Sequence, residues 1–279
     1  MATVLRSMDN KNKPLCIGDG NPLKRTYFNL VRLNKGESWS TRLDRFESVY
    51  VVLSGTVSLK VGGRSFDQVG GRDSVWSGMA DSVYVPVGQE VRLGCESAST
   101  EVAVAGAECS ETFEPFRIQP SEVEIVEVGS RELHCRRRIC HILGRNAEGR
   151  AGRLLISELY CDSGSWSGYP PHKHDTDNGA EETDSEELYH YRFKPENGFG
   201  VQVRFLDNGE SSCWMTRNGD TFLLDTGYHP TVTSPGHEEY IFTVLVGASR
   251  RSLIQNFKEE YRYLMNSIPG IANMRERFK

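Results

Sequence analysis

Short runs that alternate apolar and polar residues make up most of this chain. The clearest run covers residues 46–63, where β-branched and aromatic residues alternate with polar ones and the pattern breaks at Ser54-Gly55 and Gly62-Gly63. Runs of about 5–8 residues in this style, separated by Gly, Asn, Asp and Pro, are typical of strands. They recur at residues 81–93, 99–107, 152–161, 187–193, 199–205, 220–225 and 238–247. No helical pattern alternates with them, so the sequence predicts an all-β sandwich or barrel rather than an α/β fold.

The C-terminal tail is the exception. Apolar side chains recur there at helical spacing, at Leu253, Phe257, Tyr261, Leu264 and Met265. Ser252 can cap the start of a helix, and Pro269-Gly270 ends the pattern. We therefore predict a short helix in the tail that packs on the body of the protein or on a neighbouring subunit.

Two parts of the chain carry similar landmarks. In the first, Glu47-Ser-Val-Tyr50 is followed by Pro86-Val-Gly88; in the second, Glu187-Leu-Tyr-His-Tyr191 is followed at almost the same spacing by Gly227-Tyr-His229. Such self-similarity indicates a duplicated unit, so we predict two tandem β-domains. The expected boundaries are an N-terminal segment at 1–25, a first β-domain at 26–118, a crossover at 119–150, a second β-domain at 151–250 and a tail at 251–279.

The composition argues against several classes of protein. A net charge of −5, with 25% charged residues, is unlike the basic surface of a nucleic-acid-binding protein. No stretch approaches the ~20 apolar residues of a membrane span, and the first residues lack the apolar core of a signal peptide. The seven cysteines are odd in number and form no Cys-X-X-Cys motif, which favours scattered reduced thiols, although Cys135 and Cys140 could form a small metal or redox site. We expect a cytoplasmic protein that binds neither nucleic acid nor membranes.

The strongest local motif is Pro-Pro-His172-Lys173-His174. In a strand, His172 and His174 project to one face and Lys173 to the other. The two imidazoles are then about 6.6 Å apart along that face and can converge on one cation. A lone His-X-His pair is more often a solvated surface feature, so further ligands are needed to support a metal site.

Two later residues supply that support at cupin-like landmarks of the second repeat. Glu187 begins a strand, with Tyr189 and Tyr191 on the same face, and His229 begins another strand. Three imidazole nitrogens and one carboxylate suit Zn, Fe, Mn or Ni. The first repeat keeps Glu47 but has no histidine, and Val91 falls near the place of the final one. We therefore expect one divalent metal ion in the second domain and a first domain without metal ligands.

Residues 175–186 resemble a calcium-binding loop at positions 1, 3 and 12. Gly179 occupies position 5 and Ala180 occupies position 6, where such loops need an oxygen ligand and a glycine. No amphipathic helices flank the segment. We interpret it as an acidic surface loop that could shift nearby pKa values or gate access to the site.

Longer motifs resemble the 5-deoxy-glucuronate isomerase family of myo-inositol catabolism, which is related to the 5-keto-4-deoxyuronate isomerases. The resemblance covers most of the chain and is most specific in the four stretches Trp166–Asp175, Glu186–Phe193, Gly198–Gln202 and Gly227–Pro230. It implies an all-β fold of two tandem cupin (jelly-roll) barrels and conversion of 5-deoxy-D-glucuronate to 2-deoxy-5-keto-D-gluconate. It also implies metal ligation by His172, His174, Glu187 and His229, with zinc as the first candidate and Mn, Fe or Ni as alternatives.

Aldose–ketose isomerisation needs a Lewis acid for the carbonyl, a base for the proton and a partner for the substrate carboxylate. The sequence assigns no base. Gln202 and Arg204 face the cavity if the alternating valines pack outward, and face solvent in the opposite phase; Tyr240 and Tyr189 could bind substrate or fill the core. Rival functions are a cupin dioxygenase and a non-catalytic sugar-binding bicupin. We expect a homo-oligomer that acts on a small sugar acid.

Overall fold

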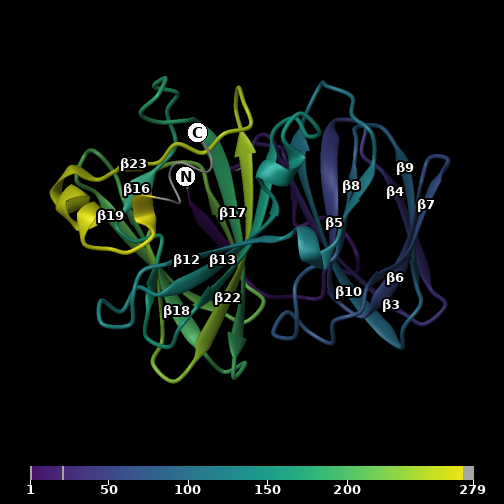
Figure 1. Cartoon of the computed structure of the whole chain (residues 1–279), viewed down its shortest axis with the longest axis horizontal. Helices are drawn as coiled ribbons and strands as arrows, with labels where there is room; N and C mark the ends of the chain where they lie inside the picture. Colours follow the sequence, from purple (N-terminus) through teal and green to yellow (C-terminus); the bar gives the residue numbers. More distant parts are fainter. Residues whose placement is uncertain (1, 21, 273–279) are drawn as a thin grey trace.

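The computed structural model describes residues 2–20 and 22–272 and contains two β-barrels that lie side by side (Figure 1). All pairings between its strands are antiparallel. This architecture confirms the prediction of an all-β chain. No helix in the described ranges is long and apolar enough to cross a membrane.

The first barrel consists of a six-stranded sheet in the order β11-β8-β5-β10-β3-β2 and a four-stranded sheet in the order β4-β9-β6-β7. Its strands are β2 (Cys16–Ile17), β3 (Thr26–Asn34), β4 (Ser38–Arg42), β5 (Phe46–Ser54), β6 (Thr56–Val61), β7 (Arg64–Gly70), β8 (Ser82–Val85), β9 (Glu90–Cys95), β10 (Ser99–Glu108) and β11 (Phe116–Ile118). Its interior is filled by apolar side chains, among them Tyr50, Leu59 and Leu93. The first barrel is therefore a packed core.

The second barrel consists of a seven-stranded sheet in the order β1-β20-β17-β22-β14-β13-β12, a four-stranded sheet β15-β21-β18-β19 and a short pair β16-β23. Its strands are β1 (Thr3–Leu5), β12 (Glu124–Val128), β13 (Arg137–Leu143), β14 (Leu154–Cys161), β15 (Trp166–Ser167), β16 (His172–Lys173), β17 (Ser185–Lys194), β18 (Phe199–Phe205), β19 (Ser211–Arg217), β20 (Thr221–Leu224), β21 (Thr231–Thr233), β22 (Glu238–Gly247) and β23 (Asn256–Phe257). Short 3₁₀ helices are η1 (Pro120–Glu122), η2 (Arg145–Ala147) and η3 (Glu259–Asn266).

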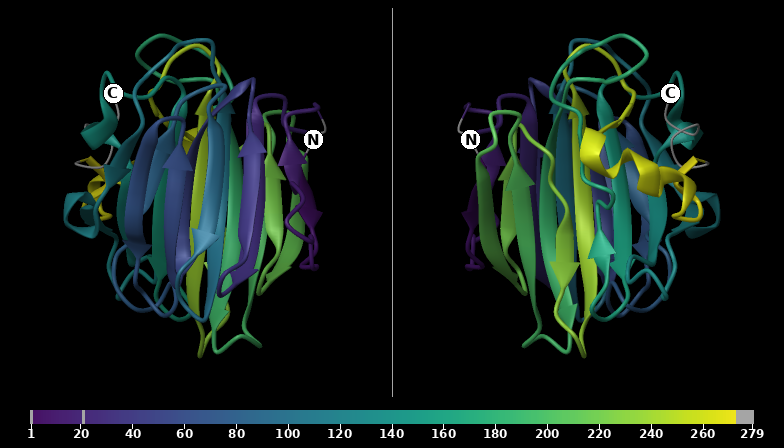
Figure 2. Two further views of the ribbon diagram at one scale, coloured as in Figure 1. Left: turned by 90° about the vertical axis from the view of Figure 1, so that its right-hand side faces the viewer. Right: turned by 90° about the vertical axis from the view of Figure 1, so that its left-hand side faces the viewer.

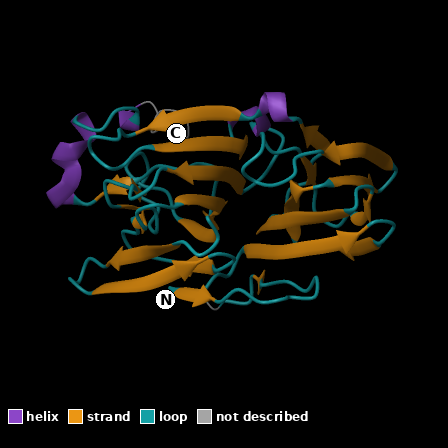
Figure 3. Ribbon diagram, turned by 90° about the horizontal axis from the view of Figure 1, so that it is seen from below, coloured by secondary structure: helices purple, strands orange, loops and turns teal. Residues whose placement is uncertain are grey.

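The six- and seven-stranded sheets pack against each other and form the largest hydrophobic cluster of the molecule (Figure 3). Val49 and Val51 from the first barrel and Val244 and Val246 from the second belong to this cluster. Strands β5 and β22 are therefore covered on both faces, which explains why they are buried almost throughout, while β6 and β9 alternate between buried residues and partly or fully exposed ones.

Strand membership differs from the expected domain organisation at two places. The N-terminal β1 pairs with β20 of the second barrel, so the first residues add a strand to the distant half of the chain. The segment expected as a crossover contributes β12 and β13, which extend the seven-stranded sheet beyond β14. The second barrel is thus built from more of the chain than residues 151–250.

The tail contains a helix, but a shorter one than the apolar spacing suggests. Leu253 and Phe257 precede it, because residues 256–257 form β23 against β16; the helix η3 starts after Lys258 and not at Ser252. Figure 2 shows the tail crossing the outer side of the second barrel before this helix. The tail is thus held by a strand pairing at the His172 strand.

Corresponding strands of the two barrels show how the duplication is aligned. Ala107 pairs with Glu47 and Thr26 in the first barrel, and Val246 pairs with Glu186 and Leu154 in the second. Glu47 therefore corresponds to Glu186. The sequence comparison that matched Glu47 with Glu187 was wrong by one residue, and a one-residue shift exchanges the two faces of a strand.

The two corresponding glutamates hold the barrels together in a reciprocal way. The side chain of Glu47 points out of the first barrel and accepts hydrogen bonds from the backbone N–H groups of Gly152, Arg153 and Leu154, at 2.5–2.9 Å. The side chain of Glu186 points out of the second barrel and accepts hydrogen bonds from the backbone N–H groups of Lys24 and Arg25, at 2.7 and 2.9 Å. Each buried carboxylate thus binds the start of the corresponding strand of the other barrel.

Candidate metal centre

Three histidine rings converge inside the second barrel. His172 lies in β16, His174 directly follows it, and His229 lies between β20 and β21. The rings are buried, and one nitrogen from each lies within 4.8 Å of the other two. The parity prediction for the His-X-His motif is therefore correct in geometry: both side chains point inward, where the third imidazole meets them.

Backbone carbonyls fix the tautomer of each ring. Nδ1 lies 3.2 Å from Pro170 O in His172, 3.1 Å from Ser185 O in His174 and 2.8 Å from Gly227 O in His229. A carbonyl only accepts, so each Nδ1 carries the hydrogen and Nε2 is the nitrogen whose lone pair can bind a metal ion. Such support is typical of histidines that ligate metals.

Glu187 completes the cluster from β17. Its Oε2 lies 3.0 Å from His174 Nε2 and 2.9 Å from His229 Nε2. Burial by itself raises the pKa of this carboxyl, but hydrogen bonds and charge from the two imidazoles outweigh burial and hold the pKa below its ordinary value. Burial lowers the pKa of His174, but the hydrogen bond and the negative charge of Glu187 outweigh burial and raise it. The carboxylate is therefore ionised and close enough to share a cation with these rings.

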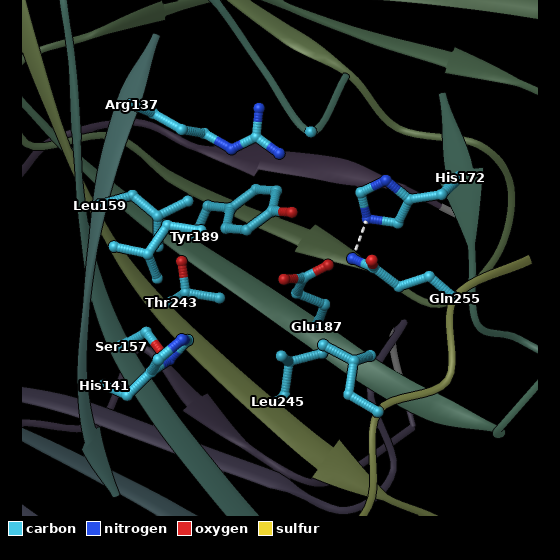
Figure 4. A pocket seen from close by; sticks show the side chains of 13 residues that line it. Arg137, His141, Ser157, Leu159, His172, Glu187, Tyr189, Thr243, Leu245 and Gln255 are labelled. Atoms are coloured by element: carbon cyan, nitrogen blue, oxygen red, sulfur yellow. Dashed lines mark hydrogen bonds between the residues drawn. The ribbon is translucent and has the colours of Figure 1, made fainter. Parts of the chain in front are cut away.

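His172 faces a different environment. Burial, followed by the neighbouring imidazoles, lowers its pKa well below the ordinary value, so its ring is neutral. Gln255 Nε2 lies 2.8 Å from His172 Nε2, which directs an amide N–H at the ring's lone pair (Figure 4). The three nitrogens and the carboxylate oxygen form a donor set that fits a divalent transition metal ion or zinc.

A cavity of about 70 Å³ opens beside His172 and Glu187. This volume has room for roughly five water molecules. Its walls are lined by Arg137, Ile139, His141, Ser157, Leu159, Gly168, His172, Glu187, Tyr189, Thr243, Leu245, Leu253 and Gln255. Figure 4 shows polar groups on several sides of this cavity, with aliphatic side chains between them.

One row of polar side chains crosses the sheet toward Tyr189. His141, Ser157, Thr243 and Tyr189 are successive cross-strand neighbours on β13, β14, β22 and β17. His141 Nδ1 lies 2.8 Å from Ser157 Oγ. Because all four side chains line the cavity, this row gives it hydrogen-bonding groups away from the histidine cluster.

The four expected substrate contacts divide into one that lines the cavity and three that do not. Tyr189 lines it. Gln202 points into the barrel, which is one of the two orientations that the sequence left open. Its amide donates to the carbonyls of His229 and Pro230, so it supports the segment that carries His229. The guanidinium of Arg204 lies 5.5 Å from the ring centre of Trp214, away from the cavity.

Tyr240 fills the core, the second of the two roles that the sequence left open, and the substrate-binding role is wrong. Its neighbours Ile241 and Thr243 point into the second barrel or its cavity, whereas Tyr240 points into the interface between the barrels. There its hydroxyl donates to Glu158, 2.8 Å away, and Glu158 also binds Arg72. Tyr240 is thus part of a buried interface network.

The acidic loop is exposed at residues 176–181, as expected for a surface loop, but Asp175 and Glu182 tie its ends to neighbouring segments. Asp175 accepts hydrogen bonds from Lys173 and from the backbone N–H of Gly227, two residues before His229. Glu182 accepts from the N–H of Asp175 and from Asn256 of the tail. In the described ranges, the histidine triad is the sole group with metal-binding spacing, and the loop instead braces the ligand segments.

Sequence reasoning missed Arg137, His141 and Gln255. The first two lie in β13, within the stretch interpreted as a crossover, and Gln255 lies in the tail. One signal was available: Arg137, Ile139 and His141 alternate with Arg138, Cys140 and Ile142, as in a strand.

The fold and the histidine cluster define a two-barrel cupin protein in which the second barrel has a potential metal centre. The chain belongs to the KduI/IolB family, whose model matches residues 6–264. It is similar to proteins named 5-deoxy-glucuronate isomerase from Geobacillus kaustophilus (33% identity, 80% of either chain) and Bacillus licheniformis (32% identity, 82% of this chain and 84% of that one).

Solved structures agree with this assignment. An IolB-like protein from Salmonella typhimurium LT2 superposes with a TM-score of 0.86 at 27% identity, over 94% of this chain and 98% of the other. A mutant of Bacillus subtilis oxalate decarboxylase superposes with a TM-score of 0.58 at 13% identity, over 84% of this chain and 71% of the other, which shows a shared fold alone. Together these matches confirm the prediction of tandem cupin barrels.

Proposed function

We propose that this protein is a metal-dependent aldose–ketose isomerase that converts 5-deoxy-D-glucuronate to 2-deoxy-5-keto-D-gluconate in myo-inositol degradation. The names of its relatives support the reaction. The observation that carries the proposal is the convergence of three buried imidazoles and Glu187 at one side of a small, partly polar cavity. That arrangement offers a cation site and a substrate site in direct contact.

The reaction transfers one proton from C2 to C1 and one from the C2 hydroxyl to the aldehyde oxygen. C2 is oxidised from alcohol to ketone while C1 is reduced from aldehyde to primary alcohol, so no external oxidant or reductant is needed. The difficult step is removal of the C2 proton, because negative charge develops on oxygen.

His172, His174, Glu187 and His229 would hold the metal ion, since the three imidazole nitrogens lie within 4.8 Å of one another and Glu187 Oε2 lies within 3.0 Å of two of them. A divalent ion there supplies Lewis acidity, worth several kcal/mol of stabilisation for charge that develops on a carbonyl oxygen. Zinc is our first candidate because it binds both imidazole nitrogen and carboxylate oxygen, with Mn, Fe and Ni as alternatives.

Glu187 and His141 are cavity groups that can accept the proton, whereas Tyr189 can only donate one. Glu187 is ionised, Tyr189 has a pKa held well above its ordinary value by burial and by the nearby Glu187 charge, and His141 hydrogen-bonds to Ser157. Tyr189 is thus a hydrogen-bond donor at all working pH values. We retain it as a proposed substrate contact.

We further propose that the enzyme works in the cytoplasm as a homo-oligomer. All seven cysteines are free in the structure, and six of them are buried, which suits a reducing compartment. The partner in the proposed reaction is a small sugar acid.

The decisive experiment follows the conversion by NMR in D₂O with protein of known metal content. We expect loss of the aldehyde, appearance of the ketone and deuterium at the carbons that exchange. Chelation followed by readdition of single metals should abolish and restore the activity, and the metal that restores it most fully identifies the native ion.

Two controls separate the rival functions. A dioxygenase would consume O₂ with the same substrate, whereas the isomerase consumes none. A sugar-binding protein would bind the sugar acid and leave it unchanged. Either result, with fully metallated protein, would contradict the proposal.

A further inference from the structure

The guanidinium of Arg137 is a buried cation that has no anionic partner among residues 2–20 and 22–272. Among the residues that the structure describes, three Lys or Arg side chains are buried: Arg72, Arg137 and Lys173. Arg72 is paired with Glu158 at 2.5 Å and Lys173 with Asp175 at 2.8 Å. Arg137 is 2% exposed and has no carboxylate within 4.0 Å in the described ranges.

Burial without an ion pair is energetically unfavourable for a charged group. Desolvation, the main influence on Arg137, lowers its pKa, yet a guanidinium remains charged under all ordinary conditions. Its hydrogen-bond acceptor on the protein is Tyr169 O, 3.3 Å from one terminal nitrogen. Most of the five N–H donors of the guanidinium therefore have no acceptor on the described protein.

These donors face the cavity that adjoins the histidine cluster. Arg137 and His172 line the same cavity, and Figure 4 shows the guanidinium directed into it beside the Tyr189 ring. Ile139 and Leu159 line the wall near it, so water competes little for the charge. The planar fork of an arginine matches a carboxylate with two parallel hydrogen bonds, which are stronger in such surroundings.

We propose that Arg137 binds the carboxylate of the sugar acid and so selects acidic substrates over neutral sugars. This inference rests on the proposed function, because it places the aldehyde end of the same molecule at the histidine cluster. In 5-deoxy-D-glucuronate the carboxylate is at the opposite end of the six-carbon chain from the aldehyde. The cavity would thus bind the substrate at both ends, the carboxylate at Arg137 and the aldehyde at the histidine cluster.

The competing explanation is that Arg137 only positions the loop before His172 through its bond to Tyr169 O. The two roles differ in their dependence on substrate charge. A positioning role affects acidic and neutral substrates alike, whereas carboxylate binding affects only the acid. Loss of binding remote from the reacting carbons should appear mainly in KM.

The experiment compares 5-deoxy-D-glucuronate with 5-deoxy-D-glucose, which has a hydroxymethyl group in place of the carboxylate. For Arg137→Met we expect kcat/KM with the acid to fall about 10²-fold or more, mostly through KM, and kcat/KM with the neutral sugar to stay within a few-fold of wild type. Arg137→Lys keeps the charge without the fork, so it should keep part of the preference for the acid.

Arg138→Met is the matched control. Arg138 is adjacent in β13 but points to the other face, where its guanidinium lies 4.5 Å from the centre of the Tyr160 ring. We expect this variant to keep the wild-type preference for the acid. An equal loss on both substrates in Arg137→Met, or no loss on either, would overturn the assignment.

Binding to metal-free protein separates this inference from the proposed reaction. Titration calorimetry with both sugars reports on Arg137 whether or not the protein turns them over. Tighter binding of the acid by wild type, lost in Arg137→Met and retained in part by Arg137→Lys, supports the carboxylate site. Equal binding of the acid by wild type and Arg137→Met refutes it, and an inactive wild type with intact acid binding contradicts only the isomerase proposal.

Discussion

The two barrels share one topology and differ in what fills their interiors. The strand ladders place Ser48 where the second barrel has Glu187, Tyr50 where it has Tyr189, and Val104 where it has Thr243. In the first barrel these positions belong to or adjoin a packed apolar core; in the second they line a cavity. The fold supplies inward positions, and a few substitutions at those positions turn a structural barrel into a site.

The largest expected effect comes from removing the residue that distinguishes the barrels most. Glu187→Ala deletes the carboxylate ligand, so we expect kcat to fall about 10³-fold or more, together with loss of bound metal. Metal analysis and NMR turnover measure both effects. Ser48→Ala, at the corresponding position of the first barrel, is the control and should leave activity unchanged; near-wild-type turnover by Glu187→Ala would refute the metal role.

The second prediction tests what the barrels have in common. Glu47→Ala and Glu186→Ala each leave buried backbone N–H groups without an acceptor, so each should lower the free energy of unfolding by about 3–4 kcal/mol. Urea unfolding checks this value. Because the contacts are reciprocal, the two losses should be similar, and a loss in only one variant would show that the barrels do not depend on each other equally.

A third prediction concerns a buried carboxyl group at a position where the first barrel has a threonine. Glu239 is fully buried, hydrogen-bonds to Thr233 and corresponds to Thr100 in the first barrel. Burial raises the pKa of Glu239 to about 7. Since the folded-state pKa exceeds the unfolded one, the folded state is favoured by this group below about pH 4.5, and that advantage is lost as pH rises to about 7.

Glu239→Gln removes this titration. We expect the variant to be more stable than wild type at pH 8 by about 3 kcal/mol, with little difference at pH 4.5. Unfolding measured at both pH values tests the sign. A variant that is less stable at pH 8 would mean that the ionised carboxylate has a stabilising partner.

The smallest effect separates two tyrosines that sequence reasoning treated alike. Tyr189→Phe removes a hydroxyl from the cavity wall, and we expect kcat/KM to fall about 10-fold, as for one lost hydrogen bond to substrate. Tyr240→Phe removes a bond to Glu158 in the interface, so it should lower stability by about 1.5–3 kcal/mol and leave KM unchanged. Kinetics and urea unfolding on both variants provide the comparison, and a raised KM in Tyr240→Phe would contradict its placement.

The sequence predicted the parts of the site that depend on residue type and spacing. His172, His174, Glu187 and His229 carry metal-binding groups at inward positions, and the structure brings them together. The errors share one physical cause. A strand has two faces and the alternation does not say which is inside, so the role of Tyr240 stayed open between substrate and core, and Glu47 was matched with Glu187.

Arg137 and Gln255 were missed for another reason. Their positions depend on where β13 and the tail pack in three dimensions, and both segments lie outside the repeated pattern. The alternation in β13 indicates a strand, but it does not say that this strand borders the cavity, and the tail carries no pattern that predicts its pairing with β16.

The reciprocal contacts of Glu47 and Glu186 have a consequence for expressing the two halves of this protein separately. A gene cut at the junction of the halves would give each product a glutamate aimed at a surface that is no longer present, and would expose the apolar faces of β5 and β22. The second half would also lack β1, which lies in the first half of the chain but pairs with β20 of the second barrel. We expect neither fragment to remain monomeric in solution, and mixing them should restore one heterodimer.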